Sequence, residues 1–159
     1  ANGPCPHGFA PIVCPVCTLT LSENPKAGAG KTKAPVTCVP TYVVGELGIG
    51  MLEGELKYGR HNYRDIPVKA SEYIDAARRH LDDWWEGVDN DTESAANLSN
   101  LVKAMACLTV LRDAQMQGKL IDDRPPGSAH VRMRTTLNEM AAKLREKYPS
   151  PPPPHTRFK

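Results

Sequence analysis

A short basic and aromatic segment, residues 57–64, concentrates side chains suited to phosphate chemistry. It reads KYGRHNYR and holds Lys and Arg cations, two tyrosines and an asparagine. Lys and Arg can clamp phosphate oxygens, while Tyr and Asn can stack on a base or hydrogen-bond to it. The candidates for substrate contacts are Lys57, Tyr58, Arg60, Asn62 and Arg64. A polar connection whose tyrosines pack on neighbouring helices has the same pattern, so both interpretations stay open.

Acidic residues on two expected helices provide possible ligands for a divalent cation. Glu46 and Glu53 lie two turns apart on the first helix, and Glu72 and Asp75 are spaced i, i+3 on the second. Mg²⁺ and Mn²⁺ prefer oxygen ligands, and a nucleoside triphosphate would supply the remaining ones. The alternative is a solvated acidic face on each helix.

Further polar residues follow on the second and third expected helices. Arg79 and His80 add cationic groups beyond what a passive loop needs. Glu93, Asn97 and Asn100 fall at i, i+4 and i+7, beside an apolar stripe of the third helix. Such a strip forms either a site or a hydrogen-bonded seam between helices, and spacing does not separate the two.

The first seventeen residues contain a complete set of zinc ligands. Cys5 and His7 are followed by Cys14 and Cys17 in a Cys-Pro-Val-Cys turn. Four such ligands form a closed, structural tetrahedral site, and clustered cysteines favour metal in a reducing cytosol over disulfides. The alternative is a set of free thiols. Cys107 falls in an apolar helical stripe and is expected to be a small core residue.

The elements that must position these residues are helices. Helical spacing predicts elements over about 42–58, 71–86, 92–115 and 129–148, with Ser71 as an N-cap and Gly87 ending the second helix. No segment alternates convincingly as a strand. The fold class is therefore all-α, a small helical bundle. We expect a zinc-binding knuckle over 1–20, a linker over 21–40, the helical domain over 41–148 and a Pro-rich tail over 149–159.

The chain totals limit the possible partners. The 159 residues are 40% hydrophobic but only 6% aromatic, which favours a homo-oligomer that shares a helical face. A formal net charge of +2 disfavours nucleic acid as a partner. No apolar run is long enough to span a bilayer and no signal peptide opens the sequence, so a cytoplasmic protein is expected.

Residues 33–126 resemble the N-terminal domain of phage dATP/dGTP diphosphohydrolases, which is related to the all-α MazG-like NTP pyrophosphohydrolases. The most specific segments are Lys57-Tyr58-Gly59-x-x-Asn62-Tyr63-Arg64 and Asp75-Ala76-x-x-Arg79-His80. The other matching segments are Val39-Pro40, Glu46-Leu47-Gly48, Leu52-Glu53-Gly54, Asp91-Thr92-Glu93-Ser94 and Asp122-Asp123-Arg124-Pro125-Pro126.

The resemblance implies hydrolysis of dGTP or dATP to the monophosphate and pyrophosphate in the cytoplasm of a phage host. Catalytic Mg²⁺ or Mn²⁺ would be held by Glu53, Glu72 and Asp75, with Glu46 and Glu93 as reserves. Substrate contacts would come from Lys57, Tyr58, Arg60, Asn62, Arg64, Arg79, His80 and Asn97. Glu53 lacks the second Glu of a Glu-x-x-Glu pair, and Asn stands at 97 and 100 where the family tends to have His. The alternative is a catalytically silent nucleotide-binding or protein-interaction module.

Overall fold

A computed structural model describes residues 6–7, 26, 30, 32–127 and 129–157. The chain divides into two compact units, 1–39 and 40–159. Among the described residues of the first unit, Val36–Cys38 form a 3₁₀ turn, η1. Three of the four predicted zinc ligands, Cys5, Cys14 and Cys17, lie outside the described residues, whereas His7 is described and exposed.

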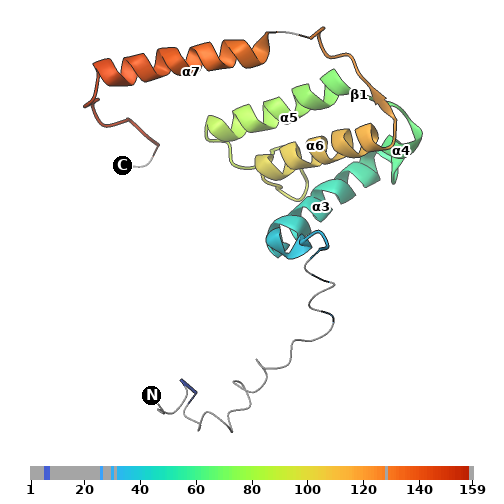
Figure 1. Cartoon of the computed structure of the whole chain (residues 1–159). Coiled ribbons are helices and arrows are strands. Elements are labelled where there is room, and N and C mark those ends of the chain that lie inside the picture. Colours follow the sequence, from blue (N-terminus) through green and yellow to red (C-terminus); the bar gives the residue numbers. More distant parts are fainter. Residues whose placement is uncertain (1–5, 8–25, 27–29, 31, 128, 158–159) are drawn as a thin grey trace. The chain divides into compact units, whose positions relative to one another are not determined.

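The second unit is built on three helices, α3 (Thr41–Tyr58), α5 (Ala70–Trp85) and α6 (Asn100–Met116), and α6 packs against the other two (Figure 1). Small residues permit this packing. Gly50 is buried against α6, and a Cβ atom there would lie 3.2 Å from Val102 Cγ1. Ala77 and Ala104 are buried on α5 and α6. The all-α expectation is confirmed in its main feature, a small helical unit.

The core is completed by a connection that joins α3 to α5. After the left-handed residue His61, the short helix α4 (Asn62–Asp65) leads into Val68. Val68 packs in the core with Val110 and Ala114, and Met51, Tyr63, Tyr73 and Leu111 surround them. Because Tyr63 reaches this cluster, the loop that carries the predicted substrate residues is fixed to the hydrophobic core.

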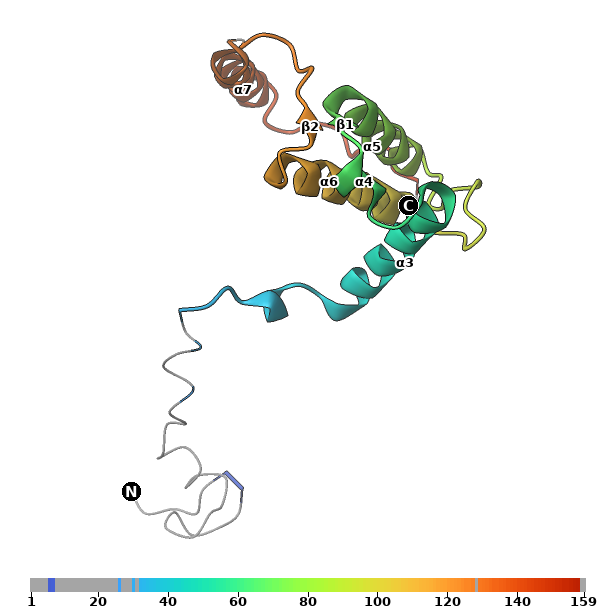
Figure 2. The same cartoon turned by 90° about the vertical axis from the view of Figure 1, so that its right-hand side faces the viewer.

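Two very short strands were not predicted. β1 (Val68–Lys69) pairs in parallel with β2 (Leu120–Ile121), with Val68 opposite Leu120 and Lys69 opposite Ile121 (Figure 2). Strands of two residues are too short to show alternation in a sequence. The pair fixes the segment after α4 beside the segment after α6.

One predicted helix start and one predicted N-cap are wrong. The third helix begins at Asn100 instead of about residue 92, with Ser99 as its N-cap; Ser99 Oγ accepts from the backbone N–H of Leu101. Residues 86–99 instead form a turn region closed by an isolated bridge between Asn90 and Ser99. At α5, Ser71 lies inside the helix, and its N–H donates to Asp123 Oδ1 at 2.9 Å. The Asp123 carboxylate, some fifty residues away in the sequence, therefore accepts from a backbone N–H at the start of α5 that has no partner within the helix.

The last helix, α7 (His130–Lys147), matches its predicted bounds within one residue. None of its described side chains is buried. The described part of the sequence has no helix long and apolar enough to cross a bilayer. The polyproline conformation expected for the tail stays a prediction.

Candidate functional site

A pocket of about 550 Å³ lies at the C-terminal half of α3, where this helix meets the 59–63 loop, α5 and α6. Its wall combines charged groups with aromatic and imidazole rings. The charged lining residues are Glu53, Glu55, Lys57, Arg60 and Lys103. The rings belong to Tyr58, His61, Tyr63, Tyr73 and His80. A concave, partly apolar site with a few charged groups is suited to a small polar ligand.

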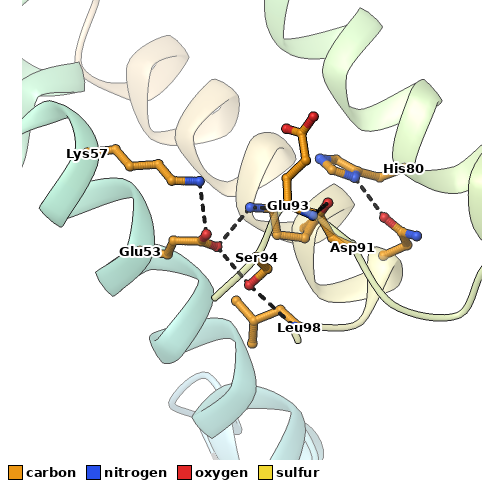
Figure 3. A network of polar contacts seen from close by, with 9 residues as sticks. Glu53, Lys57, His80, Asp91, Glu93, Ser94 and Leu98 are labelled. Atoms are coloured by element: carbon orange, nitrogen blue, oxygen red, sulfur yellow. Dashed lines mark hydrogen bonds and ion pairs between the residues drawn. The ribbon is translucent and has the colours of Figure 1, made fainter. Parts of the chain in front are cut away.

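Glu53 is the centre of a polar network in this pocket (Figure 3). Its two carboxylate oxygens accept from Lys57 Nζ at 2.9 Å and from Lys103 Nζ at 2.8 Å. Ser94 Oγ lies 3.3 Å from the same carboxylate. The hydrogen bond from Lys103, aided by Lys57, lowers the pKa of Glu53 to about 2 against the opposing effect of burial. Glu53 is therefore an anion at any physiological pH.

Lys103 joins Glu53 to a second carboxylate. Its Nζ also lies 3.2 Å from Asp91 Oδ2, and the Lys103 and Asp91 side chains are 16% and 12% exposed. Burial disfavours the ionised form of Asp91, but hydrogen bonds from the Glu93 N–H and from Lys103 outweigh it and lower the pKa of Asp91. Two carboxylates from separate segments thus converge on one ammonium group.

His80 and Asn100 form the opposite edge of the network. His80 Nδ1 lies 2.8 Å from Asn100 Oδ1, and Asn100 Nδ2 donates to the Val88 carbonyl at 2.8 Å. Asn100 is only 1% exposed. These two hydrogen bonds make Asn100 part of a seam that connects α5 with the beginning of α6, which is one of the two possibilities left open by its spacing.

Five of the predicted substrate residues line the pocket, namely Lys57, Tyr58, Arg60, Asn62 and His80. Arg64, Arg79 and Asn97 do not. Arg64 instead donates to both oxygens of Asp113, at 2.9 and 2.8 Å, and this contact raises the pKa of Arg64 and lowers that of Asp113. Asn97 was predicted to lie on the third helix, but α6 starts only at Asn100. Asn97 therefore lies in the turn before α6, where its backbone is left-handed (φ 50°).

The structure does not bring the predicted metal ligands together. Tyr73, Ala76 and His80 form the face of α5 that lines the pocket, which leaves Glu72 and Asp75 exposed and outside the lining. The reserve residues Glu46 and Glu93 are exposed as well. Within the described ranges, no three His, Cys, Asp or Glu side chains gather closely enough to hold a metal ion. The Glu53–Glu72–Asp75 cluster is therefore not assembled.

Sequence reasoning missed Lys103, Tyr73 and Cys107 as pocket residues, and it placed Asp91 only within a family motif. A charged Lys103 within an otherwise apolar helical stretch was the available signal. Cys107 was expected in the core, and it is half-buried in the pocket wall. Burial raises the pKa of both the Cys107 thiol and the Tyr73 hydroxyl, so both are neutral groups.

Residues 23–124 match the family described as dATP/dGTP diphosphohydrolase, N-terminal. No curated protein and no solved structure matches the chain. The match covers well over half of the sequence and includes every residue that lines the pocket. The chain therefore belongs to the dATP/dGTP diphosphohydrolase N-terminal family.

Proposed function

We propose that this chain hydrolyses dGTP or dATP to the nucleoside monophosphate and pyrophosphate with the help of a divalent cation. The observation that carries the proposal is the ion-pair network of Glu53, Lys57 and Lys103 in the wall of a pocket formed by the family-matched region. Lys103 extends this network to Asp91, which lies beside the pocket lining. The substrate would be a triphosphate with a bound divalent cation. The carboxylates would bind the cation, and the neighbouring ammonium groups would bind the phosphates.

The phosphates would be addressed by side chains at the pocket wall. Lys57 and Arg60 are 44% and 71% exposed, and each is paired with a glutamate, Glu53 or Glu55. Exposed ion pairs exchange partners at little cost, so both cations are available to an entering triphosphate. Tyr58 and Asn62 line the same pocket and would contact the base and sugar.

The divalent cation would be Mg²⁺ or Mn²⁺, with Glu53 and Asp91 as protein ligands. Their oxygens are already directed at one positive centre, the Lys103 ammonium, at 2.8 and 3.2 Å. These carboxylates have the hard oxygen donors that such ions prefer, and the triphosphate would add others. When bound, the cation would neutralise phosphate charge and activate water. Lys103 would then be free to pair with a phosphate.

Product analysis tests this proposal directly. The protein is incubated with an equimolar mixture of four dNTPs, once with Mn²⁺ and once with EDTA, and nucleotides and pyrophosphate are quantified. We expect a purine monophosphate and equimolar pyrophosphate only in the Mn²⁺ sample. Four intact dNTPs in both samples would refute the hydrolase.

A catalytically silent nucleotide-binding module is the second candidate. The observation that favours it is the pairing of both proposed metal ligands, Glu53 and Asp91, with lysine. Ligand at 100 times its Kd stabilises a fold by about 2.7 kcal/mol, which thermal unfolding detects. Stabilisation by dGTP without any product would support this candidate over the enzyme.

Three further features belong to the same proposal. Cys5, His7, Cys14 and Cys17 would hold a structural Zn²⁺. A homo-oligomer would cover exposed apolar residues of α3, among them Tyr42 and Leu56, which are 89% and 78% exposed. A dNTP substrate and reduced thiols both fit the cytoplasm of a phage-infected cell.

A further inference from the structure

The side-chain amide of Asn100 has one orientation that satisfies its surroundings. Its nitrogen faces the Val88 carbonyl oxygen at 2.8 Å, which only a donor can satisfy. The amide oxygen must therefore face His80 Nδ1, also at 2.8 Å. Because Asn100 is 1% exposed, turning the amide over would leave two buried acceptors facing each other.

This orientation determines the tautomer of His80. Asn100 Oδ1 is an acceptor, so His80 Nδ1 must carry the hydrogen and donate it. In the neutral ring, Nε2 is then the nitrogen without a hydrogen. Nε2 forms no hydrogen bond with any residue that the structure describes, so its lone pair is left to accept a proton.

The Nε2 side of the His80 ring lies at the pocket. His80 is one of the lining residues, and in Figure 3 the end of the ring opposite its hydrogen bond points to the Glu93 side of the network. The turn region that follows α5 supplies two charged groups on this side, Glu93 and Asp91 (Figure 3). Lys103 of α6 and Glu53 of α3 line the same pocket as His80. A basic nitrogen oriented by a buried partner is the arrangement that enzymes use to abstract a proton.

We propose that His80 Nε2 accepts the proton of the water that attacks the triphosphate, and that Asn100 is the residue that positions it. This inference rests on the proposed hydrolase. The water oxygen bonds to the α-phosphorus as its proton passes to Nε2, and the bond from that phosphorus to the bridging oxygen breaks. Pyrophosphate leaves with the electron pair, and the proton on His80 then passes to solvent.

The tautomer is tested by nitrogen-15 NMR of the full chain labelled at histidine. Cross-peaks from ring protons to the two nitrogens distinguish a protonated from an unprotonated nitrogen. At a pH where the ring is neutral, we expect hydrogen on Nδ1 and none on Nε2, with the signal assigned by its loss in His80→Asn. Hydrogen on Nε2 would overturn the inference, whatever the activity of the protein. In Asn100→Ala we expect a mixture of tautomers, and an unchanged tautomer would overturn the positioning role.

His80→Asn tests the proton transfer separately from structure. Its amide nitrogen can replace Nδ1 and still donate to Asn100, but nothing replaces Nε2. We expect kcat to fall by about 10²–10⁴-fold while KM and Tm change little. His130→Gln, an exposed change on α7, is the matched control and should keep wild-type turnover.

The two proposals fail differently in this experiment. Full turnover in folded His80→Asn would overturn the role of His80 and leave the hydrolase standing. No turnover in the wild type would overturn the hydrolase and this inference with it.

Discussion

At the scale of single residues, the state of Glu53 is set by its two lysine partners. Lys103 and Lys57 lower its pKa from 4.5 to about 2. Because the folded-state pKa lies below the ordinary value, ionised Glu53 stabilises the fold above about pH 4.5. This contribution is lost as the pH falls toward about 2.

The pH dependence of unfolding checks this assignment. Urea unfolding at pH 5.0 and pH 3.0 should show that the wild type loses more free energy of unfolding than Glu53→Gln, because the variant has no proton to take up. Glu46→Gln, on the same helix but exposed, is the matched control and should behave as the wild type does. Equal losses in the wild type and Glu53→Gln would contradict the assignment.

The two lysines on Glu53 are expected to differ in their contribution to stability. Lys103 is 16% exposed and forms ion pairs with two carboxylates, whereas Lys57 is 44% exposed and forms an ion pair with one. Lys103→Met should lower the free energy of unfolding by about 2 kcal/mol, because two partly buried carboxylates lose a partner. Lys57→Met should cost less than about 1 kcal/mol. Equal costs in urea unfolding would show that the burial of Lys103 has no energetic effect.

At the scale of elements, Arg64 connects α4 to α6 through its two bonds to Asp113. The loop that it follows lines the pocket at Arg60 and Asn62. If Arg64 acts by holding this loop, Arg64→Ala and Asp113→Ala should both raise the KM for dGTP by about three- to tenfold, with kcat little changed. If Arg64 contacts phosphate directly, only Arg64→Ala should do so. Steady-state kinetics of the two variants decide between these roles.

The glycines of α3 have different roles in packing. A Cβ atom at Gly50 meets Val102 Cγ1 at 3.2 Å, whereas one at Gly45 meets nothing within 4 Å. Gly45→Ala should raise the free energy of unfolding by up to about 1 kcal/mol, because alanine favours the helix. Gly50→Ala gains the same helix propensity, but we expect it to lower the free energy of unfolding by about 1 kcal/mol. The added methyl group would push α3 away from α6. A stabilised Gly50→Ala in thermal unfolding would mean that this contact is looser than the structure shows.

Across the whole molecule, the periodicity of apolar residues predicted the bounds of those helices whose ends are marked in the sequence. The bounds of α3 and α7 were predicted within one residue, and Gly87 does follow α5, with φ +97°. The start of α6 was missed because the apolar residue Leu98 continues its stripe although it lies in a turn region. Leu98 is buried, and its carbonyl accepts from the N–H of Asp91.

In the candidate site, the sequence predicted the residues that stand out locally and missed those whose role depends on distant partners. Residues 57–62 and His80 were found because their types are unusual for their positions. Lys103 and Asp91 were missed as site residues because their role depends on Glu53, from a helix about forty to fifty residues away. The i, i+3 spacing of Glu72 and Asp75 predicts that they share a face of the helix, but it does not predict which face lines a pocket. Both are exposed and lie outside the pocket lining.

If the chain is the proposed hydrolase, its turnover depends on the pocket network around Glu53. The most direct measurement compares dGTP hydrolysis by the wild type, Glu53→Gln and Asp75→Asn in the presence of Mn²⁺, with folding checked by circular dichroism. Both variants remove one carboxylate charge, but only Glu53 lines the pocket. We expect at least about a hundredfold loss in Glu53→Gln and near wild-type turnover in Asp75→Asn. Full activity in Glu53→Gln, or loss confined to Asp75→Asn, would show that turnover does not depend on Glu53.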